Sequence, residues 1–335
     1  MKQISKILLL LASVLLALAG CTGGDSADKV SNKEIIFADV DWDSIKFHNA
    51  VVGTIANELW GYEWKEIQGS TPITQEALMQ GEIDVHMEIW SDNLTSYDED
   101  LAAGRFKELG VNFDDNYQGI YVPRYVIEGD AERNIKAVAP DLKYIWELKN
   151  YPDVFKDDEN PEKGRIYGAI PGWEVDEILY NKYLHYKLDE NFVYFRPGSS
   201  AALASVITRA YEKGEAIAAY YWEPTWLLGQ LDMVLLEDEP YDANTYKDGK
   251  TALPAVRVTI GISNKFAEEG NEELIEFLKK YRTSSKLTSK ALAYMQETNS
   301  DYVKTAKWFL QENTELIDSW LNTSDAKKIK EFLSK

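Results

Sequence analysis

The fold class is decided by residues 74–90, which read TQEALMQGEIDVHMEIW. Residues 74–80 predict a short helix, and Gly81 directly after them is the residue type that most often ends a helix. From residue 83 to residue 89 apolar and polar side chains alternate, which predicts a β-strand that ends at Trp90. A helix followed at once by a strand indicates βαβ units and a mainly parallel sheet.

The same alternation of strands and helices recurs on both sides of this stretch. Before it, strands are predicted at 34–40 and 62–67, with a helix that begins at Ser44 and ends at Gly61. After it, strands are predicted at 165–170, 192–195, 216–221 and 234–236, with helices at 174–187 and 201–213. A strand at 256–262 and amphipathic helices from Glu268 onward complete the pattern. We therefore predict an α/β protein with two similar units and a helical C-terminal tail.

The N-terminal segment has the features of a lipoprotein signal peptide. Two lysines precede an apolar run at residues 7–20, which is shorter than the about 20 residues that a membrane-spanning helix needs. The run ends in Leu-Ala-Gly-Cys21, which resembles the bacterial lipobox, and this resemblance implies that Cys21 is lipidated. We expect a signal peptide at 1–20 and a flexible tether at 21–32. The protein would then be extracytoplasmic and lipid-anchored to the cell membrane, on its outer face or periplasmic side.

The chain is strongly acidic, with 36 Lys and Arg against 56 Asp and Glu and a net charge of −20. Removal of a signal peptide at 1–20 takes away two lysines, so the mature chain carries 34 − 56 = −22. An acidic surface repels nucleic acid, so no nucleic-acid partner is expected. Cys21 is the only cysteine, so no disulfide can form within the chain, and each of the two predicted units must be stabilised by its own core.

The sequence gives no support for catalysis. Its three histidines do not lie in an HExxH motif or beside a second metal ligand, and neither a G-x-S-x-G motif nor a P-loop occurs. We expect no enzyme, no catalytic residue, no metal site and no cofactor, and we expect a monomer. The histidines His48, His86 and His185 are interpreted as structural or surface residues.

Tryptophan is the unusual residue of this composition, with ten copies. Trp90, Trp173 and Trp222 each lie where a predicted strand ends and a loop begins. Ligands of α/β sheets bind beyond the carboxyl ends of the strands, so these three indoles could converge in one cleft. Indole faces suit a quaternary-ammonium group, which has no N–H to donate and whose charge is attracted to π-faces. The alternative is packing in the core, which is the interpretation chosen for Trp60, Trp64 and Trp146.

Three further segments carry a specific pattern: Ile-Pro-Gly-Trp at 170–173, Arg-Ala-Tyr-Glu-Lys-Gly at 209–214 and Tyr-Tyr-Trp-Glu-Pro-Thr-Trp at 220–226. Together with residues 81–90 they resemble the glycine betaine and proline betaine-binding proteins of ABC importers, the OpuAC-type family. The likeness covers most of the chain after residue 33. By these motifs the cage tryptophans of the family fall on Trp90, Trp173 and Trp222, the same three residues that end predicted strands.

The resemblance implies a two-lobe periplasmic-binding-protein fold of type II. Each lobe would be a mainly parallel sheet flanked by helices, and the C-terminal tail would pack on the first lobe. Lobe I would comprise residues 33–122 and 257–335 and lobe II residues 123–256, with crossings near 121–126 and 254–258. The implied ligand is a quaternary-ammonium compound such as glycine betaine, proline betaine, carnitine or choline. The implied partners are an ABC permease and its ATPase, and the implied role is osmoprotection.

The sequence departs from the family pattern at two positions. Leu94 stands where one branch of the family has a histidine that binds the ligand's carboxylate. Glu174 stands directly after the tryptophan of the Pro-Gly-Trp motif, where the family usually has a small residue. The backbone amides of Glu174 and Val175 remain available at a helix start, where anions bind well. Further candidate contacts are Asp92 or Asn93, which could meet an alcohol or reinforce the cation site, and Trp42 and Tyr121, which could supply further walls.

Two other functions stay open on the sequence alone. The same lobes could bind an amino acid or another polar solute, whose carboxylate would need an arginine. Only Arg124, Arg196 and Arg257 lie near suitable loops. The protein could also be a lipid-anchored sensor that binds a solute and signals to a membrane receptor.

Overall fold

The computed structural model describes residues 33–335. The predicted signal peptide, the lipidation site Cys21 and the tether therefore lie outside the described residues. Within residues 33–335, no helix combines the length and the apolar character that crossing a bilayer requires.

The first of two five-stranded sheets has the strand order β2-β1-β3-β10-β4. Its strands are β1 (Glu34–Asp39), β2 (Glu63–Gln68), β3 (Val85–Trp90), β4 (Phe106–Phe113) and β10 (Val258–Ser263). Strands β2, β1 and β3 run parallel, and β10 runs antiparallel between β3 and β4. All residues of the central strand β3 are buried, so its polar side chains His86 and Glu88 are enclosed within the lobe.

The second sheet repeats this arrangement with the strand order β7-β6-β8-β5-β9. Its strands are β5 (Gln118–Pro123), β6 (Gly164–Tyr167), β7 (Phe192–Phe195), β8 (Ala218–Trp222) and β9 (Met233–Leu235). Strands β7, β6 and β8 run parallel, and β5 runs antiparallel between β8 and β9. Two lobes of similar construction, each with a mainly parallel sheet, are therefore confirmed.

The chain passes from the first sheet to the second between β4 and β5, and returns between β9 and β10. The first crossing precedes the expected position at residues 121–126. The reason is that Tyr121 already pairs with Ala219 of β8 and with Leu235 of β9. The return segment ends near residues 254–258, where the second crossing was expected.

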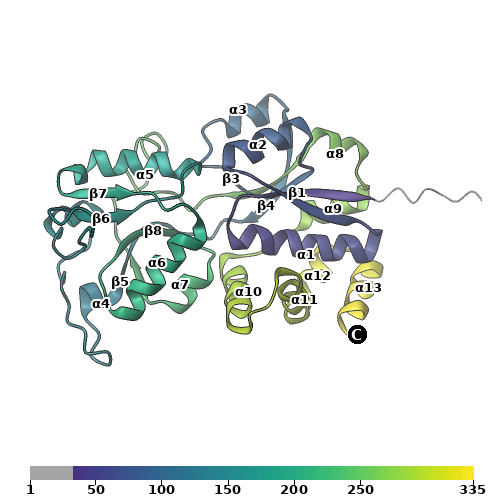
Figure 1. The fold of residues 1–335 in the computed structure, drawn as a ribbon. Coiled ribbons are helices and arrows are strands. Elements are labelled where there is room, and N and C mark those ends of the chain that lie inside the picture. The colour runs from purple at the N-terminus through teal and green to yellow at the C-terminus, as the bar shows by residue number, and fades with distance from the viewer. Residues whose placement is uncertain (1–32) are drawn as a thin grey trace, which may run out of the picture. The chain divides into compact units, whose positions relative to one another are not determined.

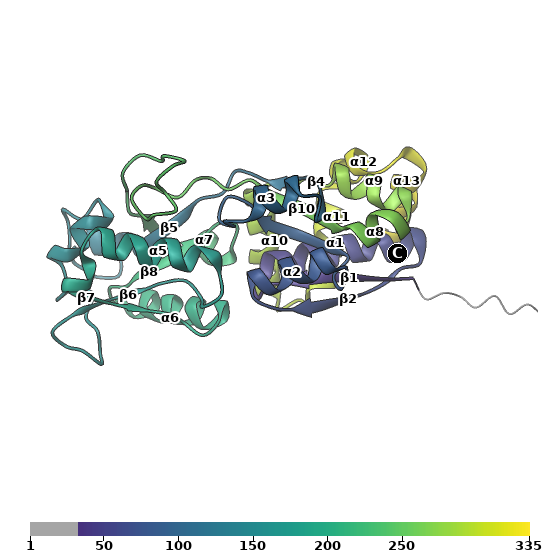
Figure 2. The same cartoon turned by 90° about the horizontal axis from the view of Figure 1, so that it is seen from above.

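Helices flank both sheets (Figures 1 and 2). Those of the first lobe are α1 (Asp43–Trp60), α2 (Thr71–Gln80) and α3 (Tyr97–Ala102). Those of the second are α4 (Arg124–Glu128), α5 (Glu174–His185), α6 (Ser200–Lys213) and α7 (Trp226–Gln230), with 3-10 turns at Ile145–Asn150 and Leu188–Glu190. The predicted glycine ends are present: Gly61, Gly81 and Gly214 follow α1, α2 and α6 with φ angles of 71°, 75° and 72°.

The C-terminal tail consists of α8 (Asn264–Glu269), α9 (Glu272–Lys280), α10 (Ser285–Thr298), α11 (Tyr302–Glu312), α12 (Thr314–Trp320) and α13 (Thr323–Leu333). Helices α11 and α13 pack against α1, and α10 contacts both α1 and α7 (Figure 1). Trp320 stacks on Tyr281 with ring centroids 4.5 Å apart, which closes the core between α9 and α12. The expected packing of the tail on the first lobe is confirmed.

Candidate ligand site

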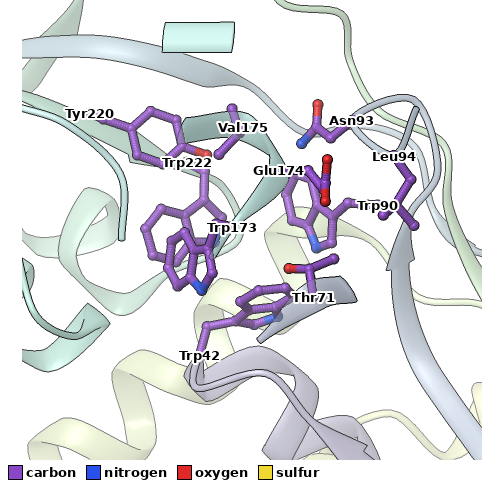
Figure 3. A pocket seen from close by; sticks show the side chains of 10 residues that line it. All are labelled: Trp42, Thr71, Trp90, Asn93, Leu94, Trp173, Glu174, Val175, Tyr220 and Trp222. Carbon is purple, nitrogen blue, oxygen red and sulfur yellow. The ribbon is translucent and has the colours of Figure 1, made fainter. Parts of the chain in front are cut away.

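Four tryptophans converge on one cavity, and each lies at or just beyond the carboxyl end of a parallel strand. Trp42 precedes α1 after β1, Trp90 ends β3, Trp173 precedes α5 after β6, and Trp222 ends β8. Their exposed fractions are only 7%, 7%, 7% and 4%. Figure 3 shows their side chains around the same space, two from each lobe. Strand ends of both sheets therefore build the site, as expected for α/β sheets.

Neighbouring rings of this group stand at right angles. The Trp42 and Trp90 rings have centroids 6.4 Å apart and an interplanar angle of 85°. The angle is 90° at 5.2 Å between Trp42 and Trp173, and 88° at 5.0 Å between Trp173 and Trp222. These perpendicular rings form successive walls, and we call Trp42, Trp90, Trp173 and Trp222 the indole cage. The cavity has an empty volume of about 370 Å³, which includes space open to solvent.

The cavity brings together most of the residues proposed from the sequence. Beside the indole cage it is lined by Thr71, Asn93, Leu94, Glu174, Val175 and Tyr220 (Figure 3). Asp92 and Tyr121 do not line it. The Asp92 carboxylate turns away to accept the backbone N–H of Arg257 at 2.9 Å, and Tyr121 is enclosed in β5 between β8 and β9.

The turn that carries Trp173 requires its glycine. Gly172 has a φ of 90°, in the left-handed region that side chains disfavour, and a Cβ there would lie 2.9 Å from Ser70 Cβ. The backbone N–H of Thr71 donates to the carbonyl of Gly172 at 3.3 Å. The Pro-Gly-Trp turn of the second lobe therefore touches the start of α2 in the first lobe, beside the cavity.

Asn93 is held by a buried amide network that joins the two lobes. Its side chain exchanges hydrogen bonds with the Gln118 amide at 3.4 and 3.2 Å. The Tyr220 hydroxyl also donates to Gln118, at 3.1 Å. Burial raises the pKa of Tyr220 well above its usual value, so its hydroxyl remains a donor. Tyr220 was part of the motif at 220–226 but was not singled out, and Thr71 gave no signal in the sequence.

A buried carboxylate lies directly behind two of the indoles. Glu88 Oε2 accepts the indole N–H of Trp42 at 2.6 Å, the Ser44 hydroxyl at 3.1 Å and the indole N–H of Trp90 at 3.4 Å. Burial raises the pKa of Glu88 to about 7, although these three hydrogen bonds act in the opposite direction. The sequence does not mark Glu88 as part of the site, since a polar residue in an alternating strand is ordinarily assigned to the solvent face.

His48 lies next to this carboxylate without forming an ordinary ion pair. Its Nε2 is 3.5 Å from Glu88 Oε1, and its Nδ1 is 2.8 Å from the Tyr281 hydroxyl. Burial lowers the pKa of His48 to about 3, so the imidazole is neutral at physiological pH. When Tyr281 donates to Nδ1, the proton on Nε2 faces Glu88.

The cavity lining contains one carboxylate, Glu174, and no lysine or arginine among residues 33–335. Burial, followed by the charge of Glu177, raises the pKa of Glu174, while Lys247 opposes the rise. Acidic side chains also occupy the first turn of α5, at Glu174, Asp176 and Glu177. These negative charges make the start of α5 a weaker binding site for an anionic ligand than a helix start without acidic side chains.

The three arginines considered for an amino-acid carboxylate are all engaged elsewhere. Arg124 binds Asp232 and Glu128, Arg196 binds Asp176, and Arg257 binds both oxygens of Glu108. None of them lines the cavity. In the part of the chain that the structure describes, no group of three His, Cys, Asp or Glu could hold a metal ion.

Known structures that share this fold include three binding proteins. A glycine betaine/L-proline-binding protein (ProX) from Borrelia burgdorferi has a TM-score of 0.68 and 18% identity, over 89% of this chain and 100% of that one. A choline-binding protein of an ABC transporter, in complex with choline, has a TM-score of 0.68 and 19% identity, over 90% of this chain and 99% of that one. Lactococcal OpuAC complexed with glycine betaine has a TM-score of 0.66 and 18% identity, over 87% of this chain and 100% of that one. At these identities the likeness concerns the fold.

Comparison with curated proteins gives no match. Residues 33–312 match the family model OpuAC, described as the substrate binding domain of the ABC-type glycine betaine transport system. The match spans nearly all of the described residues, including both lobes and most of the helical tail. The chain therefore belongs to the OpuAC family of substrate-binding domains of ABC transport systems.

Proposed function

We propose that this protein captures a quaternary-ammonium compound in the indole cage and delivers it to an ABC permease driven by its ATPase. The ligand class includes glycine betaine, proline betaine, carnitine and choline, and the uptake serves osmoprotection. In this proposal the mature protein is a monomeric extracytoplasmic lipoprotein, anchored to the membrane through Cys21 after removal of residues 1–20.

The observation that carries the proposal is the arrangement of four buried indoles at right angles around a cavity without a basic side chain. A trimethylammonium group cannot donate a hydrogen bond, but each π-face attracts it by about 0.5–2 kcal/mol. Perpendicular walls offer several faces to one cation at once. The names of two similar structures, a glycine betaine-binding and a choline-binding protein, support the same class.

Ligand capture requires the two lobes to open and close, and several contacts between them lie at the cavity. Ser200 of α6 donates from its backbone N–H to the Asp41 carboxylate at 3.3 Å. On the other side, Lys247 Nζ donates to the carbonyl of Leu94 at 3.2 Å, and the Tyr246 hydroxyl donates to the carbonyl of Asp92. We propose that these contacts form on closure. Because β5 lies in the second sheet, we place the first lobe boundary between residues 113 and 118 instead of at 122.

A thermal-shift screen tests the ligand class. A ligand that binds only the folded state raises stability by about 2.7 kcal/mol at a hundredfold excess over its Kd. We expect choline, glycine betaine, proline betaine or carnitine to raise the melting temperature, and arginine and glutamate to leave it unchanged. A shift with the amino acids alone would support the polar-solute alternative instead.

Membrane anchoring has a separate test in cells. We expect the wild type to incorporate radioactive palmitate and to fractionate with the membrane, because Cys21 follows a lipobox-like sequence. The Cys21→Ala variant should incorporate no label and should be secreted or remain unprocessed. Equal labelling of both proteins would refute the anchor and leave the ligand assignment untouched.

A further inference from the structure

Glu88 occupies an unusual place for a carboxylate, at the centre of the first lobe and directly behind the cage. Its Oε2 accepts hydrogen bonds from both Trp42 and Trp90. These two indoles are the first-lobe walls of the indole cage, and no other acceptor holds their N–H groups within residues 33–335. One oxygen atom therefore fixes the orientation of two walls out of four.

The charge of this carboxylate has no counter-ion nearby. Glu88 is completely buried, and within residues 33–335 no lysine or arginine forms an ion pair with it. From α1 it is faced by Ser44 and the neutral His48, and behind His48 stands Tyr281. Two residues before Glu88 on β3, His86 Nδ1 accepts the backbone N–H of Glu88 at 3.3 Å, and burial lowers the pKa of His86 to about 3.

The remaining neighbours bring no positive charge. From α10, the Thr288 hydroxyl approaches His48 Nε2 at 3.4 Å, and from β4 the Phe113 ring lies against both His48 and Trp90. Glu88 Oε1 has no hydrogen-bond partner in the described residues. A buried carboxylate with one free oxygen and no counter-ion is costly when ionised, and a cation held on the far side of the two indoles would relieve that cost.

We propose that Glu88 is a positioning and specificity-determining residue of the indole cage: it orients Trp42 and Trp90, and its charge makes the cage select net cations and release a proton when one binds. This inference rests on the proposed function. In this view the bound cation is the counter-ion that Glu88 lacks in the free protein.

The direction of the pH effect follows from the surroundings of Glu88. In the free protein burial raises its pKa to about 7. A cation in the cage favours the ionised form, so the pKa is lower in the complex than in the free protein. Affinity for a cation is therefore highest above about pH 7, falls as the pH decreases through 7, and levels off where Glu88 is protonated in both states.

The same charge distinguishes a cation from a zwitterion. Choline carries only the positive group, whereas glycine betaine brings a carboxylate that meets Glu174 at the rim and no arginine in the cavity lining. The carboxylate of betaine also offsets part of the attraction between its ammonium group and Glu88. We therefore expect choline to bind more tightly than betaine and to release more protons.

The test is calorimetry of the wild type with choline and with tetramethylammonium, in buffers of different ionisation enthalpy. Neither ligand titrates in the range studied. For a pKa lowered by one unit, affinity should be about tenfold higher at about pH 8.5 than at about pH 5.5. Near pH 6.5, about half a proton should leave per ligand bound. Constant affinity with no proton release would overturn the inference.

Two variants separate charge from shape. Glu88→Gln keeps the size and an acceptor for the indole N–H groups, so it should retain binding but lose the pH dependence, the proton release and much of the preference for choline. Glu174→Gln, at the rim, should keep the proton release. If Glu88→Gln keeps the wild-type pH dependence, another group releases the proton and the inference is wrong. If it does not fold, the proton count of the wild type still decides.

These outcomes are distinct from a failure of the proposed function. If no quaternary-ammonium compound binds at any pH, the proposed function is wrong and the role of Glu88 falls with it. If binding occurs without linkage to a proton, the function stands and only the role of Glu88 is refuted.

Discussion

The two halves of the indole cage are built on different chemistry. In the first lobe, Trp42 and Trp90 donate their indole N–H groups to a buried carboxylate on the central strand. In the second lobe, none of the hydrogen bonds within residues 33–335 involves the indole N–H of Trp173 or Trp222. Trp222 instead lies between aromatic neighbours, with the ring centroids of Tyr220 and Tyr221 at 5.7 and 4.8 Å.

This difference separates two tasks that one binding site must perform. The first-lobe half contains a titratable carboxylate that holds both of its rings by hydrogen bonds, so it can set the preference for a cation and its dependence on pH. The second-lobe half supplies neutral aromatic surface, whose contribution is area and π-contact. Substitutions in the two halves should therefore differ in kind as well as in size, and the following experiments test that difference.

Removal of a second-lobe wall should have the largest effect on affinity. Trp173→Ala or Trp222→Ala deletes a cation–π contact of about 0.5–2 kcal/mol and apolar burial of about 1.5–3 kcal/mol. We expect Kd to rise at least about thirtyfold for each variant, since about 1.4 kcal/mol corresponds to a factor of ten. Calorimetry on the folded variants measures the loss, and wild-type affinity in both would refute the cage assignment.

Trp60→Ala is the matched control for these changes. Its indole lies at the end of α1, donates to Glu273 at 2.9 Å and packs on Phe277 of α9, away from the cavity. The variant should therefore lose some stability but retain its affinity. A loss of affinity as large as that of Trp173→Ala would mean that the measurement reports folding and not ligand contact.

The buried charge of Glu88 should also affect the stability of the ligand-free protein. The pKa of Glu88 is about 7 in the folded protein and 4.5 for the ordinary carboxyl group. The folded state therefore holds the proton more tightly, so the stability that Glu88 contributes is full below about pH 4.5 and is lost as the pH rises through 7. The loss amounts to roughly 3 kcal/mol.

This contribution must be isolated from two histidines that act in the opposite direction. Burial lowers the pKa values of His48 and His86 to about 3, so their contribution decreases as the pH falls below 6.5. The difference in unfolding free energy between the wild type and Glu88→Gln removes the histidine contribution. In urea titrations, we expect the unfolding free energy of the wild type to decrease relative to that of the variant as the pH rises from about 4.5 to 7.5. A constant difference would contradict the raised pKa.

Replacing tryptophan by phenylalanine should expose the difference between the two halves most clearly. Trp42→Phe keeps a weaker π-face but removes the shortest hydrogen bond to Glu88, which acts to lower its pKa. The pH at which affinity for choline rises should therefore move upward. Trp173→Phe should weaken binding several-fold with an unchanged pH profile, because its indole N–H has no part in the Glu88 cluster. Identical pH profiles for the two variants would show that the halves are equivalent.

The contacts of the segment between β9 and β10 should have the smallest effect. Tyr246→Phe and Lys247→Met each remove one hydrogen bond to the carbonyl of Asp92 or Leu94, next to the cavity. We expect each to weaken binding about threefold, mainly through faster dissociation, since a net hydrogen bond is worth about 0.5–1.5 kcal/mol. Lys250→Met is the control, since among the described residues the Lys250 ammonium group pairs only with Asp248 of its own segment. Equal dissociation rates for all three variants in stopped-flow fluorescence would exclude a role in closure.

The walls of the site could be predicted from the sequence because strand ends are visible in it. Alternation ending at Trp90 and Trp222, and the Pro-Gly-Trp turn, place these side chains at sheet edges without knowledge of the tertiary structure. The same logic failed for Glu88. Alternation predicts which residues share a face, but β3 is a central strand with both faces covered. Only the tertiary structure reveals this, because α1 packs on one face and α2 packs against the other face of the sheet.

Loop geometry accounts for the other differences. Asp92 and Asn93 are neighbours in one loop, and the sequence could not tell that Asn93 faces the cavity while Asp92 binds the backbone of Arg257. Tyr121 was placed at a crossing, but the strand β5 begins before it and encloses it in the second sheet. Tyr220 could have been proposed from its position two residues before Trp222, on the same side of β8.

The central claim is that the indole cage recognises a permanent positive charge through its π-faces. Calorimetry of the wild type with choline and with 3,3-dimethyl-1-butanol, its neutral analogue with carbon in place of nitrogen, tests this claim most directly. The two ligands have nearly the same shape, so apolar burial is matched and only the charge differs. We expect choline to bind at least about a hundredfold more tightly, from several cation–π contacts of about 0.5–2 kcal/mol each. Equal affinity for both ligands would contradict the account.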